Sequence, residues 1–468
     1  MPILNDVHSR LNPTDVRRIV RPADLLALQE VVRCAARDGD RLSIGGGRHA
    51  MGAQQFAGNE IHVDTTALTA VLATDDERGL LRIEAGAMWP AIIAATHRMR
   101  APGDGRWAIR QKQTGVDDVT LGGSIGANAH GRGLQMAPLV EDIEDLSLVD
   151  ANGQLLHCSR SDNPELFSLV VGGYGLFGIV YAATLRLTPR RRVKRLVDIL
   201  ELRDAMHVVR RRIEQGCLYG DFQFVIDAHD PAFLQRGVLA CYEPVDAPTG
   251  AGQGLDDGRS DLTADDWTRL LRLAHDDKAA AFVRYAQHYL GTHGQTYWAD
   301  TMQLSTYLSS YPEFLAATGS SEGAVTETLV IGEHYIPRDS LVAFMEGAAQ
   351  VLRQVDVEVI YGTIRSIRQD TTSFLPWAKG DWACVIFNLR TQHTSAGLQR
   401  TAEAFRRIVD VALALGGSFF LTYHRYATRD QVLQAYPAMP AFLAAKHRHD
   451  PHDRFVSDWY HHMRALVG

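Results

Sequence analysis

A glycine-rich stretch from Thr120 to Gly131, with the sequence TLGGSIGANAHG, constrains this chain more than any other feature. Glycines let backbone N–H groups approach an anion closely, and the Thr, Ser and Asn side chains add further polar groups. A second glycine cluster, Gly45 to Gly52, follows a short run at 41–44 and reads GGGRHAMG. Two such loops predict a site that holds both ends of one pyrophosphate, as a dinucleotide would require.

The easily named nucleotide motifs do not fit. The sequence has no Gly-x-x-x-x-Gly-Lys-Ser/Thr run, so a P-loop is excluded. A formal G-x-G-x-x-G occurs at Gly173, Gly175 and Gly178, but that fingerprint must open a helix. The residues from Ile179 to Thr188 are rich in β-branched and aromatic side chains and predict a strand instead. A Rossmann fold is therefore not expected.

Taken in order, six segments of the first 190 residues resemble the FAD-binding domain of the vanillyl-alcohol oxidase and p-cresol methylhydroxylase superfamily. The order and spacing carry the resemblance, because glycine-rich turns alone are common. It implies an α+β protein, with a two-part FAD-binding domain of the p-cresol methylhydroxylase type and a substrate (cap) domain of antiparallel sheet and helices. The six segments are a helix at 22–38, the Gly45 loop, 61–64, 82–89, the Thr120 loop and 175–180.

The resemblance also implies which residues bind FAD. In that family the first loop and the Thr-x-Gly-Gly segment bind the pyrophosphate, and a buried diphosphate needs many donors. Each glycine has an alternative role as a turn residue with positive φ. Residues expected at the pyrophosphate are Gly45, Gly46, Gly47, Arg48, Thr120, Gly122, Gly123 and Ser124; those expected nearer the isoalloxazine or along the rest of the cofactor are Asn128, His130, Gly131, Ile179 and Val180.

Many members of the superfamily attach the flavin covalently through a histidine in the first loop. Counted forward from the glycines, Arg48 stands in that position and His49 comes one residue late. Counted back from Gly52-Ala53-Gln54, His49 takes the histidine's place. The FAD is accordingly expected to be either non-covalent or linked through His49. A second attachment used by some relatives, a cysteine before the Thr-x-Gly-Gly segment, is missing from the sequence between 101 and 122.

Length and composition bound the class of protein. A chain of 468 residues with 46% hydrophobic content predicts at least two domains. We expect an FAD-binding domain at 1–190, a substrate domain at 191–415 and a C-terminal segment at 416–468 that returns to the FAD domain. The net charge of −7 gives no basic footprint for nucleic acid. Five cysteines without C-x-x-C spacing favour reduced thiols and a cytoplasmic location.

Two other features of the sequence bear on whether the protein has a membrane segment or a metal site. The run 166–185 carries no charge, but its glycines and strand formers predict a buried loop and strand, so no integral membrane segment is expected. The histidines near the C-terminus match no zinc spacing, and Asp450-Pro451 interrupts any helix that would align them. No metal site is predicted.

The second half of the chain alternates strand-like runs with helical patterns. Helices are expected at 341–355 and at 397–415, the latter ending at Gly416-Gly417. The stretch 248–258 predicts an exposed loop. Together these patterns favour a mainly antiparallel sheet backed by helices, with strands at 222–226, 326–336, 357–365, 382–389 and 418–426.

The substrate wall is expected on this sheet. The two-residue period of a strand places Tyr361, Thr363 and Arg365 on one face. The segment 374–388 is similar to aldonolactone and alditol oxidases and to decaprenylphosphoryl-ribose oxidases, and the closing pattern at 450–458 resembles the last group. In that group a lysine faces the flavin; here Tyr423 stands in its place and His424 follows.

Oxidation of an alcohol requires hydride transfer from carbon to flavin N5 as the hydroxyl loses its proton, so a base is expected beside the substrate oxygen. The candidates are His424, His130 and Tyr423, the last only if a cation such as Arg365 or Arg132 lowers its pKa. Arg132 is also expected to place positive charge near the flavin or a polar substrate. Each of these residues has a purely structural role as its alternative.

The sequence thus predicts an FAD-dependent oxidoreductase that dehydrogenates a CH–OH group of a small sugar-, polyol- or lactone-like substrate. Oxygen or another acceptor would take the electrons. The alternative is a reductase of a carbon–carbon double bond that uses NAD(P)H. A flavin-binding protein without catalysis is a third possibility, since the family's lysine is missing.

Overall fold

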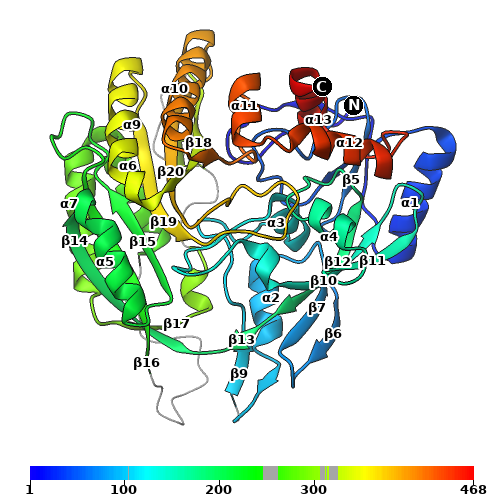
Figure 1. Cartoon of the computed structure of the whole chain (residues 1–468), viewed down its shortest axis with the longest axis horizontal. Coiled ribbons are helices and arrows are strands. Elements are labelled where there is room, and N and C mark those ends of the chain that lie inside the picture. The colour runs from blue at the N-terminus through cyan, green and yellow to red at the C-terminus, as the bar shows by residue number, and fades with distance from the viewer. Residues whose placement is uncertain (104, 246–261, 306–310, 312–313, 316–324) are drawn as a thin grey trace.

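The computed structural model of this chain describes residues 1–103, 105–245, 262–305, 311, 314–315 and 325–468. The loop predicted at 248–258 lies outside these ranges. Figure 1 shows two lobes side by side, with the N-terminal half of the chain in one and the large sheet in the other. The lobes are joined by strands, loops and the C-terminal helices.

The first sheet of the N-terminal lobe is small and parallel. Its order is β3 (Arg18–Val20), β5 (Ile61–Asp64), β4 (Leu42–Gly45). Helix α1 (Leu25–Asp38) covers it with Leu28, Val32 and Ala35, as the sequence predicts. Asp24 caps the helix by accepting from the Ala27 N–H, and Gly39 ends it at φ 75°. This unit presents the turn after β4, which is the first glycine cluster.

The second sheet of this lobe is antiparallel. In chain order, the helices α2 (Trp89–Thr96), α3 (Leu121–Ala127) and α4 (Pro164–Val170) come between strands of this lobe. Their side chains, such as Trp89, Leu121 and Phe167, belong to one hydrophobic core with the sheet. Smaller pairings are β1 (Ile3–Leu4) with β2 (Thr14–Asp15), and β13 (Thr188–Pro189) with β9 (Gly105–Ala108) and β8 (Arg100–Ala101). The strands of the five-stranded sheet lie in the order β11 (Leu155–Ser159), β10 (Ile143–Val149), β12 (Ile179–Arg186), β7 (Leu80–Glu84), β6 (Val71–Asp75).

The second lobe is built on an eight-stranded antiparallel sheet. Helices α5 (Leu202–Glu214), α9 (Leu341–Val355) and α10 (Ser395–Ala414) pack on one face, and α6 (Ala264–Asp276) and α7 (Lys278–Gly291) cover part of the other (Figure 1). The order is β17 (Thr296–Trp298), β14 (Arg192–Glu201), β16 (Arg236–Val245), β15 (Tyr219–Phe224), β19 (Val359–Ile367), β20 (Trp382–Gln392), β18 (Glu327–Pro337), β21 (Ser418–Phe419).

The C-terminal helices α11 (Arg429–Ala435), α12 (Met439–His449) and α13 (Asp458–Val467) lie back against the first lobe. Leu42 of β4 donates its N–H to the Arg454 carbonyl at 2.7 Å, and the Val456 N–H donates to the Leu42 carbonyl at 2.9 Å. We propose on this basis the division into 1–190, 191–415 and 416–468.

The α+β class is confirmed, with mixed helices and antiparallel sheets. The residues after Gly178 form β12, so the Rossmann fingerprint is rejected as predicted. The strand expected at 418–426 is wrong beyond Phe419, because the backbone leaves the sheet there and the Thr422 carbonyl accepts from the Met51 N–H at 3.0 Å. The loop expected at 120–131 contains a helix, α3, because Thr120 supplies an N-cap.

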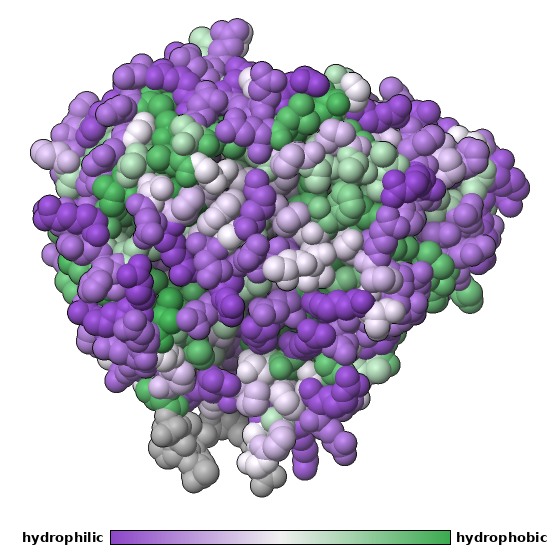
Figure 2. All heavy atoms as spheres, viewed as in Figure 1, coloured by the Kyte–Doolittle hydropathy of each residue, from purple (hydrophilic) through white to green (hydrophobic). Residues whose placement is uncertain are grey.

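In the part of the chain that the structure describes, no helix combines the length and apolar character needed to cross a bilayer. The uncharged run predicted as a buried loop and strand is α4, a turn and the start of β12. Figure 2 shows polar side chains over most of the drawn face, with apolar ones in separate patches.

Candidate active site

A cavity of about 640 Å³ lies between the two lobes. Its lining from the first lobe comes from the turn after β4, from α3 with its preceding loop, and from the segment before and at the start of β12. Its lining from the second lobe comes from one face of β15, β18, β19 and β20. A single space therefore connects the glycine-rich segments to the sheet that was expected to form the substrate wall.

The two glycine clusters pack directly against each other at one end of the cavity. A Cβ at Gly46 would collide with the Thr120 side chain, and a Cβ at Gly47 would collide with the Asp118 carbonyl. The Thr120 hydroxyl accepts from the Gly123 N–H at 3.1 Å and so fixes the start of α3. This close packing requires glycine and leaves backbone N–H groups near the cavity.

The charge at this end suits a diphosphate. Among the described residues that line the cavity, the carboxylates are Asp221 and Glu333, and both belong to the eight-stranded sheet. The glycine-rich end contributes Arg48 instead. Backbone donors, a helix N-terminus and an arginine are a donor set that fits the FAD pyrophosphate, and the nearby Asp118 carboxylate, 3.4 Å from His49, is outside the described lining.

Most of the predicted cofactor residues line the cavity, but two do not. Asn128 and Gly131 are absent from its described lining, so the cavity gives no support to their expected place beside the flavin. The predicted residues that do line it are Gly45, Gly46, Gly47, Arg48, His49, Thr120, Gly122, Gly123, Ser124, His130, Ile179 and Val180.

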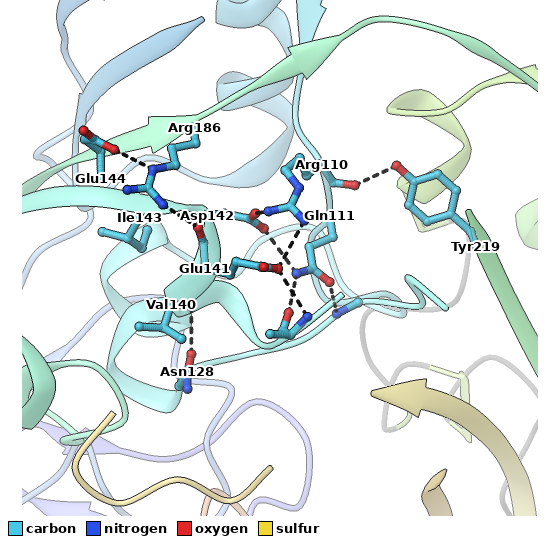
Figure 3. Close-up of polar contacts among 12 residues, drawn as sticks. Arg110, Gln111, Asn128, Val140, Glu141, Asp142, Ile143, Glu144, Arg186 and Tyr219 are labelled. Carbon is cyan, nitrogen blue, oxygen red and sulfur yellow. Dashed lines mark hydrogen bonds and ion pairs between the residues drawn. The ribbon is translucent and has the colours of Figure 1, made fainter. Parts of the chain in front are cut away.

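Asn128 holds the backbone rather than the cofactor. Its Oδ1 accepts from the Val140 N–H at 3.0 Å, as Figure 3 shows, and its Nδ2 donates to Asp370 at 2.8 Å. The same figure shows Gln111, whose Oε1 accepts from the Gly131 N–H at 3.3 Å. Both residues that miss the cavity are therefore occupied by contacts that shape the ribbon on either side of His130.

An ion-pair network anchors this ribbon to both lobes (Figure 3). Arg110 donates to Asp142 at 2.6 Å and to Glu141 at 3.1 Å, and the Tyr219 hydroxyl of β15 donates to the Arg110 carbonyl at 2.7 Å. Burial raises the pKa of Asp142 to about 6, although Arg110 acts in the opposite direction. The network connects the FAD lobe to the large sheet just behind His130.

A buried carboxylate, Glu333 on β18, is the centre of the polar contacts at the junction of the lobes. Its Oε1 lies 2.6 Å from His130 Nε2 and accepts from the Tyr335 hydroxyl at 2.5 Å. Its Oε2 accepts from the Tyr423 hydroxyl at 3.0 Å. The Cys384 thiol donates to Oε1 at 3.3 Å. Glu333, His130 and Tyr423 all line the cavity.

The hydrogen bonds assign protons within this group. His130 Nδ1 lies 3.0 Å from the Gly131 carbonyl, which can only accept, and Nε2 faces a carboxylate. Nδ1 therefore carries a proton, and Nε2 lies within hydrogen-bond distance of the carboxylate. Burial acts to raise the pKa of Glu333, but His130 and the Tyr335 hydroxyl outweigh it and hold the pKa at about 2. Glu333 is ionised at neutral pH.

The condition under which Tyr423 could act as the base, a pKa lowered by a nearby cation, is not met. Burial raises the pKa of Tyr423 well above its usual value, and the negative charge of Glu333 raises it further. Arg365 opposes these effects but is the weakest of them. Tyr423 is therefore a protonated phenol whose hydrogen points to Glu333, and its free lone pair is available as an acceptor.

His424 does not line the cavity, so the structure gives no support to its expected role as a base. Its ring stacks on Tyr426 with centroids 5.1 Å apart, and its side chain is buried away from the sheet face. Burial lowers the pKa of His424 to about 4. The lining from this segment comes from Phe420, Thr422 and Tyr423, and the next residue, His424, is outside it.

His49 lines the cavity, and both of its ring nitrogens have partners. Nε2 lies 3.1 Å from the Asp118 carbonyl, which requires a proton on that nitrogen, and Nδ1 lies 2.9 Å from His8 Nε2. Burial lowers the pKa of His49 and, to about 4, that of His8, so both rings are neutral at pH 7. The Nδ1 lone pair of His49 accordingly accepts the proton of His8.

The wall of the large sheet is polar, as predicted from its two-residue period. Tyr361, Thr363 and Arg365 all line the cavity. Arg132 also lines it, with Nη1 3.4 Å from Asp221 and Nη2 donating to the Met302 carbonyl at 2.7 Å. This face can hydrogen-bond several hydroxyl groups at once.

Glu333, Asp221 and Gln223 were not found from the sequence. Glu333 could have been found, because it is a charged residue inside the apolar run of β18 and lies on the cavity face with Ile331. Asp221 and Gln223 stand in a short strand with no distinctive motif. Asp221 and Gln223 face the cavity because β15 pairs with β19, and the sequence does not show this pairing.

A metal at this group does not agree with the contacts. His130, Glu333 and Cys384 place ligand atoms within 4.8 Å of one another. The 2.6 Å contact between His130 and Glu333 is a direct hydrogen bond, and burial raises the pKa of the Cys384 thiol well above its usual value. A protonated thiol and an occupied imidazole are poor ligands. The expectation of no metal stays a prediction.

Comparison with known proteins agrees with this geometry. Residues 16–159 match the family described as FAD binding domain. The chain is 29% identical to L-gulonolactone oxidase of Bos taurus over 172 residues, which is 36% of this chain and 37% of that protein. It is 29% identical to decaprenylphosphoryl-beta-D-ribose oxidase of Mycolicibacterium smegmatis over 184 residues, 38% of each chain.

A longer match is to L-gulono-1,4-lactone dehydrogenase of Mycobacterium tuberculosis, at 22% identity over 455 residues and 96% of both chains. The stronger matches, by contrast, span less than two-fifths of their relatives' length. These matches support the resemblance to the vanillyl-alcohol oxidase and p-cresol methylhydroxylase superfamily, and the cofactor is FAD. Within that superfamily it is similar to the aldonolactone oxidase and decaprenylphosphoryl-ribose oxidase groups.

Proposed function

We propose that this protein is an FAD-dependent oxidoreductase that dehydrogenates a CH–OH group of a sugar-, polyol- or lactone-like substrate. The observation that carries the proposal is the position of Glu333. This buried carboxylate accepts a hydrogen bond from Tyr423 in the same cavity that the two glycine-rich segments enter. The substrate class is supported by three relatives, two of them named for gulonolactone and one for a decaprenylphosphoryl ribose.

FAD, bound at the glycine-rich end through Gly45 to Arg48 and the start of α3, would supply the hydride acceptor. The oxidant that removes the electrons afterwards, oxygen or another acceptor, is part of the proposal.

The chain's own residues handle the proton. The Tyr423 oxygen accepts a hydrogen bond from the substrate hydroxyl while its own proton points to Glu333 Oε2. As the C–H bond breaks, the substrate oxygen becomes that of a protonated carbonyl, which is a strong acid. A carboxylate with a pKa of about 2 is then a sufficient acceptor through Tyr423. The contacts of Glu333 with His130 and with the Tyr335 hydroxyl keep its pKa low, so it is ionised before the reaction.

The sheet wall would position the substrate. Thr363, Tyr361 and Asn388 offer side-chain donors and acceptors along two adjacent strands, and all three line the cavity. A substrate with several hydroxyls can satisfy these groups, whereas an apolar alkene would leave buried polar atoms unpaired.

The test is anaerobic bleaching of the bound flavin at 450 nm by a panel of polyols, aldoses and aldonolactones, with NADH and NADPH in parallel. The proposal expects bleaching by at least one alcohol donor and none by the nicotinamides. Bleaching by NADPH alone would instead favour a double-bond reductase. Failure of every donor would point to a flavoprotein without catalysis.

For the flavin linkage we propose non-covalent FAD. A bond to His49 needs the lone pair of Nδ1, and His8 donates to that atom. Acid precipitation is expected to release the yellow colour into the supernatant. Colour that stays in the pellet in wild type, and leaves it in His49→Ala, would contradict this.

A cytoplasmic location is also part of the proposal. It rests on the five cysteines, which the structure leaves without disulfides.

A further inference from the structure

Arg365 is an arginine that lines the cavity. It lies on β19, but in the described parts of the chain its guanidinium has no hydrogen bond and no ion pair. Its Nε is buried with no acceptor. A guanidinium carries five N–H donors and is always charged, so an unmatched one in a partly buried wall is costly unless a ligand satisfies it.

The charges around Arg365 are otherwise matched. The carboxylate of Asp221 stands beside it across the β15–β19 pair but is engaged by Arg132 at 3.4 Å and by Gln223 at 3.3 Å. Glu333 is paired with His130 at 2.6 Å. Arg195, another arginine of the lining, adds positive charge to the same lobe. The sheet side of the cavity therefore carries an excess of positive charge.

The position of Arg365 fits a group on the substrate. It shares the cavity face of β19 with Thr363 and Tyr361, whereas Arg48 serves the glycine-rich end where the diphosphate of FAD is expected. Glu333 lies on β18, two strands away across β20, so the two backbones are about 10 Å apart at the usual strand spacing. A single sugar unit with one terminal substituent can reach from the proton acceptor to Arg365.

We propose that the substrate is an acidic sugar derivative, and that Arg365 binds its oxyanion. The proposal rests on the proposed function and narrows it. Carboxylate and phosphate groups both match the planar donor fork of arginine, so a sugar acid and a sugar phosphate are the two sources of that anion.

The experiment compares matched pairs of donors in the anaerobic flavin reduction of the holoprotein. The pairs are D-gluconate with D-glucitol, for a carboxylate, and D-glucose 6-phosphate with D-glucose, for a phosphate. In wild type, the acidic donor of at least one pair is expected to half-saturate flavin reduction at a lower concentration than its neutral partner. Arg365→Met should raise that concentration on the order of 10- to 100-fold, the loss expected for a charge-assisted hydrogen bond, and leave the neutral partner within about 3-fold.

Two further variants control for charge and geometry. Arg368→Met removes an exposed arginine three residues along the chain and is expected to change neither member of a pair. Arg365→Lys should recover part of the loss, since charge returns without the bidentate fork. Equal saturation by acidic and neutral donors in wild type, or an equal effect of Arg365→Met on both, would overturn the proposal.

A binding measurement separates this inference from the proposed function. Gluconate and glucose 6-phosphate are titrated aerobically and anaerobically while the flavin absorption spectrum is followed for a perturbation. Saturable perturbation that weakens in Arg365→Met but not in Arg368→Met supports the anion site even if no donor reduces the flavin. No perturbation by either anion, or a change in FAD affinity as the only effect of Arg365→Met, would overturn it.

Discussion

The two ends of the cavity are built in different ways. At the FAD end, consecutive residues of two short segments supply backbone groups, and the collision of a Cβ at Gly46 with Thr120 shows why glycine is needed. At the sheet end, side chains from β15, β18, β19 and β20 meet although they are far apart in the sequence. The first end is a property of local sequence, and the second is a property of strand register.

This difference has a functional consequence. Backbone donors recognise a phosphate whatever side chains surround them, so the FAD end can stay the same while the chemistry changes. Substrate and proton transfer depend on a few side chains of the sheet, so a change at the sheet end alters the reaction. Variants at the two ends should therefore affect different measurements.

The largest expected effect is at the sheet end. Glu333→Gln removes the charge that accepts the proton through Tyr423 but keeps the shape of the side chain. We expect kcat to fall by about 100-fold or more, the usual range for loss of a general base, while FAD stays bound. The control is Glu327→Gln, a half-buried acid at the start of the same strand that does not line the cavity. Unchanged kcat in Glu333→Gln would exclude the proton path.

A smaller effect is expected at the FAD end. Gly46→Ala forces the Thr120 side chain to move, and an overpacked contact typically costs about 1–3 kcal/mol. The dissociation constant for FAD should rise roughly 5- to 150-fold, measured by titrating apoprotein with FAD. Gly58→Ala is the matched control, since a Cβ there meets nothing within 4 Å. Equal FAD affinity in both variants would contradict the close packing of the two clusters.

Tyr423→Phe tests the link between the ends. The ring remains, but the hydroxyl that donates to Glu333 at 3.0 Å is lost. We expect kcat to fall by about 10- to 100-fold, less than in Glu333→Gln, because a water can partly replace the hydroxyl. His424→Phe serves as the comparison, and its kcat should stay near that of wild type. A larger loss in His424→Phe than in Tyr423→Phe would return the base to His424.

The smallest effect on activity is expected behind the sheet. His334 follows Glu333 on β18 but faces the helices, with rings of Phe344, Phe387 and Phe405 around it. Burial lowers its pKa from 6.5 to about 3, so the unfolded chain binds the additional proton between these pH values. Stability should be full above pH 6.5 and fall as the pH drops toward 3.

His334→Phe removes this proton linkage without touching the cavity. Its free energy of unfolding should depend less on pH between 6.5 and 4 than that of wild type, with a slope that is smaller by up to roughly 1.4 kcal/mol per pH unit. Thermal midpoints measured across this pH range would show the difference. Activity at pH 7 should change little. An unaltered pH dependence of unfolding would show that the pKa of His334 is the same in the folded and the unfolded protein.

The same contrast explains what the sequence could predict. Gly45 to Gly47, Thr120 and Ser124 were found because a local motif carries their role, and all of them line the cavity. The contacts of Asn128 and Gly131 with Gln111, Val140 and Asp370 could not be predicted, because the position of a residue in the motif says nothing about these distant partners.

At the sheet end the predictions followed the strands. Tyr361, Thr363 and Arg365 were found from the two-residue period of β19. Glu333 was missed because its role needs the packing of β18 on His130. His424 was a candidate base although it does not line the cavity, because its direction depends on where the chain turns after β21. Neither contact leaves a local pattern.

The most direct test of the account is the rate of anaerobic flavin reduction by one alcohol donor, measured in wild type, Gly46→Ala and Glu333→Gln, all saturated with FAD. The account predicts that Gly46→Ala, once loaded, reduces its flavin within about 3-fold of the wild-type rate, and that Glu333→Gln is at least about 100-fold slower. If both variants slow together, or if Glu333→Gln keeps the wild-type rate, the two ends of the cavity do not have the separate roles described above.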